Sequence, residues 1–254
     1  MDTRPLAVIT GGSSGIGLAL AHRLARRQWR LALVARGAER LHEAAAALPV
    51  ETSAHVCDVG DPDAVAALAD ELLALGGGRV DLLVCNAGIP GRAGALDVDP
   101  AVARAVMDVN YHGMVGLTRG LWPGLVAARG RVVNVCSVAG TVALARSAPY
   151  SASKHAALAW SRALAAAAPA AGVRVLTVNP GPVPTPGFPQ ADLLAHRIGR
   201  RFVVTDDDCA AAIVRGLERR RTEIFVPEWW RFAGVLQAVA PTAFGRAAAR
   251  ARRG

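Results

Sequence analysis

Residues 5–17 of the chain are PLAVITGGSSGIG. The apolar run from Pro5 to Thr10 predicts a short buried strand, and the glycines that follow predict a tight turn. Residues 18–29, LALAHRLARRQW, then place apolar side chains at helical spacing. Strand, glycine-rich turn and helix in this order favour binding of a dinucleotide, because glycines let a pyrophosphate approach the N-terminus of the helix.

Alternation of strand and helix continues along the chain. Apolar runs predict six further strands, at residues 30–35, 50–57, 80–85, 131–137, 173–178 and 222–226, and amphipathic segments lie between them. This order predicts an α/β fold. We expect a single doubly wound Rossmann-type domain over residues 1–254, with a seven-stranded, mostly parallel sheet and helices on both faces.

The composition excludes several classes of protein. Apolar residues make up 52% of the chain and charged residues 19%, which is typical of a globular protein. No apolar run is long enough to span a membrane or to act as a secretory signal, so we expect a cytoplasmic protein. The cysteines and histidines show no metal-ligand spacing, and we expect Cys57, Cys85 and Cys136 to be small buried side chains. No nucleic-acid motif accompanies the basic charge, so nucleic acid is not an expected partner.

Residues 137–154, SVAGTVALARSAPYSASK, carry the candidate chemistry. Tyr150 and Lys154 are four residues apart, so a helix that begins near Tyr150 places both side chains on one face. An ammonium beside a phenol lowers the pKa of the phenol, which can then exchange a proton near neutral pH. Ser137 ends a predicted strand, and its hydroxyl can donate to a developing alkoxide. Lys154 is also the only lysine in the chain.

The end of the second predicted strand distinguishes between two nicotinamide cofactors. In a dinucleotide-binding fold, an acidic residue there binds the ribose 2′-hydroxyl and repels a 2′-phosphate. This chain has Ala35 and then Arg36 at that position, with Arg40 nearby. Because a guanidinium replaces the carboxylate, the sequence predicts NADP(H).

Residues after the third and fourth predicted strands extend this site. Asp58 can accept a hydrogen bond from the adenine amino group or cap the next helix, for which Asp61 is better placed. The small residues of Asn86-Ala87-Gly88 let the backbone approach the cofactor ribose.

The segment from Pro100 to about Leu121 predicts one long helix. Asn110 lies inside it and is a poor helix former among apolar neighbours. Its presence indicates a local break in the helix or a polar site that faces the cleft, rather than a surface asparagine.

The sixth predicted strand leads into a loop. Residues 179–190, NPGPVPTPGFPQ, are rich in proline and glycine, which predicts fixed turns where ligands bind in open α/β sheets. We expect residues 186–204 to form a lid over the substrate. Thr205 and Asp208 then predict a capping box for the helix that follows.

The C-terminal extension, residues 227–254, is apolar and basic. Nine arginines and three glutamates between Arg215 and Gly254 give a net charge of +6, out of +9 for the whole chain. A short helix here can gather six apolar side chains on one face, namely Trp229, Trp230, Phe232, Val235, Leu236 and Val239. Two arrangements stay open: the helix lies at a membrane interface, or it packs over the substrate cleft or a dimer partner. Both suggest a hydrophobic, lipid-like substrate.

Taken together, these motifs resemble the short-chain dehydrogenase/reductase family. The resemblance covers about residues 5–185. It rests on seven elements in order: TGGSSGIG at 10–17, CDV at 57–59, CNAG at 85–88, Asn110, NVCS at 134–137, YSASK at 150–154 and NPGPVPT at 179–185. Seven elements at the right spacing are far more specific than a glycine-rich turn alone.

The resemblance implies roles for the matching residues. Tyr150 donates or accepts the proton, Ser137 polarises the substrate carbonyl, and Lys154 binds the nicotinamide ribose and lowers the pKa of the tyrosine. Asn110 anchors a water that links Lys154 to solvent. The implied cofactor-binding residues are Gly11, Ser13, Ser14, Gly15, Ile16, Gly17, Arg36, Asp58, Val59, Asn86, Ala87, Gly88, Tyr150, Lys154, Pro180, Gly181, Val183 and Thr185, with no metal.

The chain departs from the family pattern at three places. Cys85 stands where the family usually has asparagine, and Cys136 where it often has serine. The C-terminus lacks the glycine-rich segment that helps many bacterial members form tetramers. We therefore expect a homodimer through the helices that contain Asn110 and Tyr150, while a tetramer and peripheral contact with the inner face of a membrane stay open.

The sequence as a whole predicts an NADP(H)-dependent oxidoreductase that reduces a ketone or oxidises a secondary alcohol on a hydrophobic substrate. Two alternatives stay open. One is a non-catalytic NADP(H)-binding sensor or scaffold, against which the complete Ser–Tyr–Lys set argues. The other is an epimerase or dehydratase on the same fold. The walls of the substrate pocket are expected from residues 89–96, 141–148 and 186–203.

Overall fold

The computed structural model describes residues 4–185, Phe188 and residues 203–250. Its strands are β1 (Leu6–Thr10), β2 (Arg30–Ala35), β3 (Thr52–Val56), β4 (Leu82–Cys85), β5 (Arg131–Val135), β6 (Arg174–Pro180) and β7 (Glu223–Val226). They form one seven-stranded sheet in the order β3-β2-β1-β4-β5-β6-β7. Every neighbouring pair in this sheet is parallel, so the predicted doubly wound α/β fold is confirmed.

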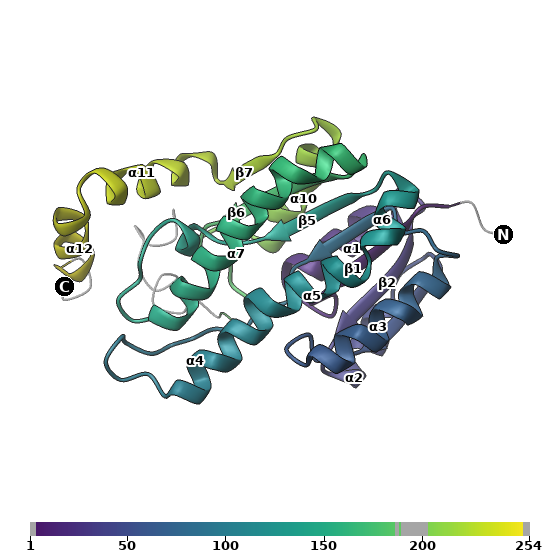
Figure 1. The fold of residues 1–254 in the computed structure, drawn as a ribbon, viewed down its shortest axis with the longest axis horizontal. Helices are drawn as coiled ribbons and strands as arrows, with labels where there is room; N and C mark the ends of the chain where they lie inside the picture. The colour runs from purple at the N-terminus through teal and green to yellow at the C-terminus, as the bar shows by residue number, and fades with distance from the viewer. Residues whose placement is uncertain (1–3, 186–187, 189–202, 251–254) are drawn as a thin grey trace.

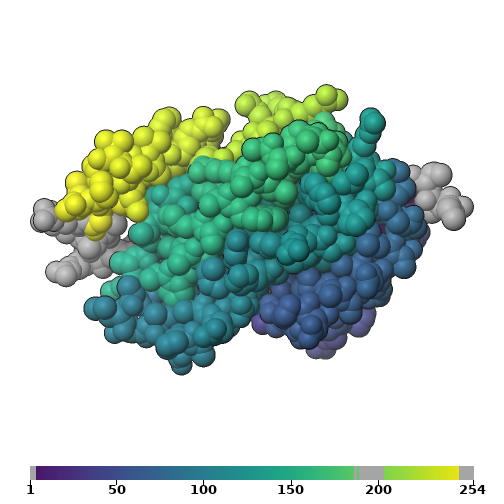
Figure 2. Space-filling view, in the orientation of Figure 1, coloured from purple at the N-terminus to yellow at the C-terminus, as the bar shows by residue number. Residues whose placement is uncertain are grey.

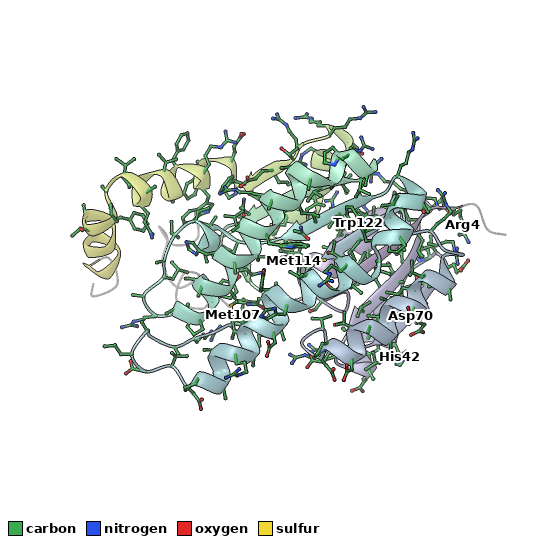
Figure 3. The ribbon with its side chains drawn as sticks, viewed as in Figure 1. Arg4, His42, Asp70, Met107, Met114 and Trp122 are labelled. Atoms are coloured by element: carbon green, nitrogen blue, oxygen red, sulfur yellow. The ribbon has the colours of Figure 1, made fainter. Side chains whose placement is uncertain are left out.

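Helices cover both faces of the sheet (Figure 1). One core lies under α1 (Gly15–Ala25), α2 (Ala38–Ala46) and α10 (Asp206–Glu218), and the other under α3 (Pro62–Leu75), α5 (Gly113–Gly120) and α7 (Ala148–Ala167). Successive strand residues alternate between the two cores, as Val8 and Ile9 do. Met114 of α5 points into the second core, whereas His42 and Asp70 face solvent (Figure 3).

The helix predicted from Pro100 to Leu121 is interrupted. α4 (Pro100–Met107) runs into a π-helical turn, η1 (Asp108–His112), before α5 begins, and α6 (Trp122–Ala128) follows. Asn110 lies in the π turn and is only 2% exposed. The local break that Asn110 indicated takes the form of this π turn, and the side chain of Asn110 makes buried hydrogen bonds that the wider turn accommodates. The homodimer expected through these helices stays a prediction.

Buried polar contacts fix α7 on the sheet. Asn134 of β5 donates from Nδ2 to the Ser161 Oγ at 3.0 Å, and the hydroxyls of Ser161 and Thr177 lie 2.7 Å apart. These three side chains are at most 1% exposed. Because they join the middle of α7 to β5 and β6, they hold this helix against the two strands.

The C-terminal extension leaves the sheet after β7. It forms a short 3₁₀ turn, η4 (Glu228–Trp230), and then α11 (Arg231–Val239) and α12 (Pro241–Arg250). Figures 1 and 2 show α11 and α12 reaching beyond the edge of the sheet, in yellow. The lid expected at residues 186–204 lies outside the described residues, except for Phe188 and residues 203–204.

Two predicted helix caps are confirmed. The Thr205 Oγ1 accepts from the Asp208 backbone N–H at 3.0 Å and donates to the Asp208 carboxylate at 2.7 Å. The Asp61 carboxylate accepts from the backbone N–H groups of Asp63 and Ala64, at 2.9 and 3.2 Å. Both caps satisfy helix N–H groups that have no partner inside the helix.

The cap of α3 can be tested by substitution. Asp61→Ala removes the acceptor and is expected to lower the free energy of unfolding by about 1 kcal/mol. Asp61→Asn keeps a capping oxygen and serves as the matched control, with a much smaller loss. Urea unfolding followed by circular dichroism compares the three proteins. An equal loss in both variants would show that the cap is not what stabilises this helix.

Candidate active site

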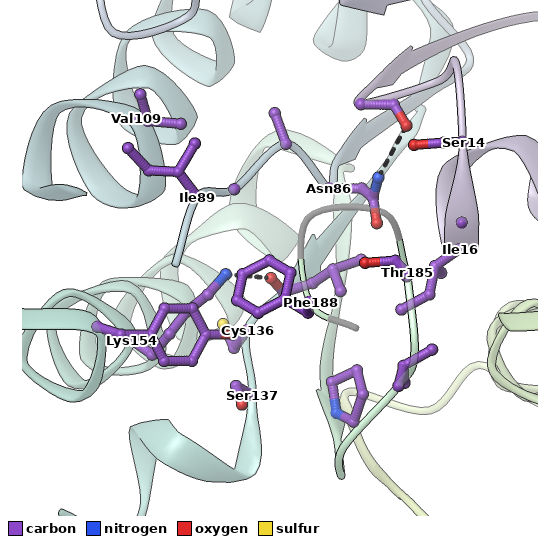
Figure 4. A pocket seen from close by; sticks show the side chains of 18 of the residues that line it. Ser14, Ile16, Asn86, Ile89, Val109, Cys136, Ser137, Lys154, Thr185 and Phe188 are labelled. Atoms are coloured by element: carbon purple, nitrogen blue, oxygen red, sulfur yellow. Dashed lines mark hydrogen bonds between the residues drawn. The ribbon is translucent and has the colours of Figure 1, made fainter. Parts of the chain in front are cut away.

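The loops at the carboxyl edge of the sheet line a cavity of about 780 Å³. Open α/β sheets bind their ligands at this edge. The predicted site residues that line it are Gly11, Ser13, Ser14, Gly15, Ile16, Arg36, Asp58, Val59, Asn86, Ala87, Gly88, Ser137, Tyr150, Lys154, Pro180, Gly181, Val183 and Thr185. Figure 4 shows Lys154, Cys136 and Ser137 on one side of the cavity and Ser14, Ile16 and Thr185 on the other.

Two predicted site residues do not line the cavity. Gly17 is buried in α1, where a Cβ would collide with the carbonyl oxygen of Gly11. Asn110 lies behind the wall: its Oδ1 accepts from the Ile89 N–H at 2.8 Å, and its Nδ2 donates to the Ile89 carbonyl and the Ser153 Oγ at 3.1 and 3.0 Å. Both residues therefore shape the site from outside it.

The glycine-rich turn forms a cradle for an anion. Gly11 and Gly15 have φ values of +65° and +53°, which other residues rarely adopt. The first turn of α1 contains no acidic residue, so its N–H groups and the helix dipole favour a negative charge. The Asn86 Nδ2 donates to the carbonyls of Thr10 and Gly11, at 3.0 and 3.3 Å, and fixes the turn against the loop after β4. The cradle fits the pyrophosphate of a dinucleotide.

Arg36 follows β2 and lines the same cavity as the glycine-rich turn. Its NH1 lies 3.6 Å from the Asp58 Oδ2, and the two side chains are 57% and 46% exposed. A loose pair between exposed charges contributes little energy, so the guanidinium is available to a phosphate. Asp58 accepts from the Gly60 N–H at 2.9 Å and does not cap α3, which is the role of Asp61.

Tyr150 and Lys154 lie on one face of α7, as their spacing predicts. The Lys154 Nζ lies 5.8 Å from the centroid of the Tyr150 ring. Lys154 is 4% exposed, and its Nζ donates to the Val135 carbonyl at 3.0 Å (Figure 4). The end of β5 thus holds the ammonium beside the phenol. Ser137 lies two residues after Val135, and its Oγ accepts a hydrogen bond from the Ala139 N–H at 3.0 Å.

The acidity of Tyr150 differs from the sequence-based expectation. Burial raises the pKa of Tyr150 to about 12, although a hydrogen bond with the side chain of Ser137 opposes this shift. Burial also lowers the pKa of Lys154. The expected lowering of the tyrosine pKa by Lys154 was therefore wrong for the protein by itself, because the desolvation of the phenolate dominates.

The cysteines near strand ends are buried, as predicted, and none forms a disulfide in the described part of the chain. Burial raises the pKa of both Cys85 and Cys136 to about 12. A thiol with so high a pKa is a poor nucleophile at neutral pH, so both cysteines act as small core side chains.

Two aromatic residues of the cavity wall come from segments that the sequence placed near the substrate, namely the loop at 186–203 and the C-terminal extension. The Phe188 ring lies 5.4 Å from the Tyr150 ring, between centroids, and Trp230 packs against the backbone of Gly181. The single apolar face predicted for the extension was therefore wrong, since Trp230 faces the cavity whereas Trp229, stacked on it at 4.5 Å, is 41% exposed. The position of Trp230, four residues after the carboxyl end of β7, could have indicated its place in the site.

Comparison with known proteins identifies relatives over most of the chain. The profile described as short chain dehydrogenase matches residues 5–192. Dehydrogenase/reductase SDR family member 7B from Xenopus laevis is 34% identical, over 94% of this chain and 79% of its own length. The bovine protein of that name is 37% identical over 71% of this chain, which spans 58% of the bovine length. Granaticin polyketide synthase putative ketoacyl reductase 1 from Streptomyces violaceoruber is 35% identical, over 72% of this chain and 69% of its own length.

Solved structures agree with these relatives. A metagenomic short-chain oxidoreductase in complex with NADP superimposes with a TM-score of 0.73 at 31% identity, over 87% of this chain and 96% of its own. An enzyme from Burkholderia phymatum in complex with NAD gives a TM-score of 0.83 at 26% identity, over 92% and 93% of the two chains. A nicotinamide cofactor is thus common to the neighbours. The chain belongs to the short-chain dehydrogenase/reductase family.

Proposed function

We propose that this oxidoreductase uses NADP(H) to reduce a ketone, or in reverse to oxidise a secondary alcohol. The observation that carries the proposal is the buried group of Ser137, Tyr150 and Lys154 in the same cavity as the anion-binding turn. The cofactor supplies or accepts the hydride when it is bound. Similarity to a putative ketoacyl reductase supports a carbonyl substrate.

Tyr150 acts as the proton donor in the direction of reduction. With a pKa of about 12 the phenol is protonated at neutral pH, so it can give a proton to a carbonyl oxygen that becomes an alkoxide. The Ser137 hydroxyl already accepts from the Ala139 N–H, which leaves its own proton for the same substrate oxygen or for Tyr150. Two donors that converge on one oxygen stabilise the developing charge.

Lys154 and Asn110 support this donor in different ways. The Lys154 Nζ uses one of its three donors on the Val135 carbonyl, which leaves two for hydroxyls of the cofactor ribose. Asn110 donates to the Ser153 Oγ, which in turn donates to the Tyr150 carbonyl at 2.8 Å. Asn110 is thus a positioning residue for the first turn of α7. Its expected role in holding a water stays a prediction.

A hydrophobic substrate suits the walls of the cavity near Tyr150. Phe188, whose ring centroid lies 5.4 Å from that of Tyr150, lines the cavity together with the apolar side chains of Val142, Leu144 and Trp230. α11 supports this wall, because the Gln237 Oε1 accepts from the Ala143 N–H at 2.9 Å. The arrangement favours an apolar group next to the reacting carbonyl, such as the chain of a 3-oxoacyl compound.

Loss of the phenol tests the proton donor. Tyr150→Phe is expected to reduce kcat/KM for ketone reduction by at least about 100-fold, with NADPH affinity unchanged, because only the proton is lost. For alcohol oxidation by the wild type, kcat/KM is expected to rise with pH between 7 and 10, since that direction needs the phenolate, whereas ketone reduction does not fall in this range. NADPH absorbance and fluorescence titration measure both quantities. Activity retained in Tyr150→Phe would refute the assignment.

The cofactor preference can be tested at Arg36. Arg36→Ala is expected to lower kcat/KM for NADPH about tenfold or more, because a charge-assisted contact to the 2′-phosphate is lost. The same variant with NADH is the internal control, since NADH lacks this phosphate and its kcat/KM should change little. A parallel loss with both cofactors would mean that Arg36 supports the fold and does not read the phosphate.

The substrate wall can be tested with 3-oxoacyl compounds of rising chain length. We expect kcat/KM of the wild type to rise with chain length and this rise to flatten in Trp230→Ala, because the indole borders the cavity. Phe232→Ala is the matched control, since Phe232 is 66% exposed and outside the cavity wall. If small soluble ketones react as well as long chains in all three proteins, the hydrophobic substrate class is wrong.

A further inference from the structure

α11 presents an apolar stripe to solvent. Phe232, Val235, Leu236 and Val239 follow the spacing of one helix face and are 66%, 59%, 56% and 79% exposed. Five of the nine large apolar side chains exposed in the described part of the chain lie between residues 229 and 239. Such a concentration in one short segment marks a surface that binds something, because single exposed apolar residues are normally scattered.

The opposite face of α11 fixes the direction of this stripe. Gly234 packs on Thr141, and a Cβ at residue 234 would lie 2.7 Å from the Thr141 Cβ. Gln237, one turn further along, accepts from the Ala143 N–H at 2.9 Å. α11 is thus attached to the segment after Ser137 by one face, and it cannot turn the stripe inward without losing these contacts.

The extension that contains the stripe carries a net positive charge. Residues 227–254 contain five arginines and one glutamate, Glu228. The charged side chain of α11 itself, Arg231, lies 3.3 Å from the Glu228 carboxylate at the start of the extension. An apolar stripe, the partly exposed Trp229 just before it and a net positive charge in the same segment are the features of a helix that lies in the interface of an anionic membrane.

A second copy of the chain fits the stripe less well. α11 has nine residues and is about 14 Å long, whereas a stable dimer buries roughly 800 Å² on each partner. Self-association through this face would also bring together two segments that each carry five arginines and one glutamate, so their net charges would repel. A lipid surface with negative headgroups removes both difficulties.

We propose that α11 docks the protein on an anionic lipid surface, with Phe232, Val235, Leu236 and Val239 inserted among the headgroups. The contact is peripheral, since the helices that the structure describes are too short or too polar to cross a bilayer. Trp230 lines the cavity immediately before α11, so docking places the cavity close to the lipid. The proposal goes beyond the reductase activity and does not require it.

Vesicle co-sedimentation of the full chain tests the proposal. The wild type is expected to sediment with vesicles of phosphatidylcholine and phosphatidylglycerol, less with phosphatidylcholine alone, and less in high salt. Phe232→Gln/Leu236→Gln is expected to weaken binding at least about tenfold. Val56→Gln/Val126→Gln is the matched control, because these side chains are 54% and 37% exposed on β3 and α6 and should bind like the wild type.

Three outcomes would overturn the proposal. The first is that the wild type does not bind the mixed vesicles. The second is that the stripe variant binds them as well as the wild type does. The third is that none of the proteins binds lipid and light scattering shows a dimeric wild type but a monomeric stripe variant, which would assign the stripe to a second copy. Circular dichroism and NADPH titration establish that the variants are folded. Because the assay contains no carbonyl substrate, its failure leaves the proposed reductase activity untouched.

Discussion

Parallel pairing of the central strands is the constraint on which the site depends. β1, β4, β5 and β6 run in one direction, so their carboxyl ends meet at one edge of the sheet. That edge presents the glycine-rich turn, the Asn86 loop and the Val135 carbonyl to a single cavity. α7 gains its place from the same pairing, because Asn134 and Thr177 on β5 and β6 hold Ser161 in the middle of the helix. Without the parallel register, the anion cradle and Tyr150 would not share a cavity.

Burial in this cavity disfavours the charged forms of both Tyr150 and Lys154. It raises the pKa of Tyr150 and lowers that of Lys154, so it favours the neutral form of both. The protein opposes this at two points, through the Ser137 side chain for the phenol and the Val135 carbonyl for the amine. A phenol that stays protonated at neutral pH is in the form that a proton donor needs.

Local chemistry made much of the fold predictable from the sequence. Apolar runs gave all seven strands to within a few residues, and Asp61 and Thr205 marked the starts of their helices, because strand burial and helix caps depend on neighbouring residues. Most of the cavity residues followed from the motifs that resemble the family. Asn110 indicated a local break in its helix, but the form of that break, a π turn, depends on hydrogen bonds to the distant residues Ile89 and Ser153. The pKa of Tyr150 likewise depends on how deeply the folded chain buries the phenol, which its spacing from Lys154 does not reveal.

The sequence left two arrangements open for the C-terminal extension: a helix at a membrane interface, or a helix packed over the substrate cleft or a dimer partner. A helical pattern alone did not separate them. Trp230 and Phe232 are two residues apart, yet the first borders the cavity and the second is 66% exposed. Residues two apart lie about 200° apart around an α-helix, so Trp230 belongs on the face opposite Phe232, and η4, which contains Trp230, leads directly into α11. One segment therefore closes the cleft with its first residues and presents an apolar face with the rest. These two roles are compatible, because Gly234 and Gln237 hold α11 on the substrate wall by the side that the stripe does not use.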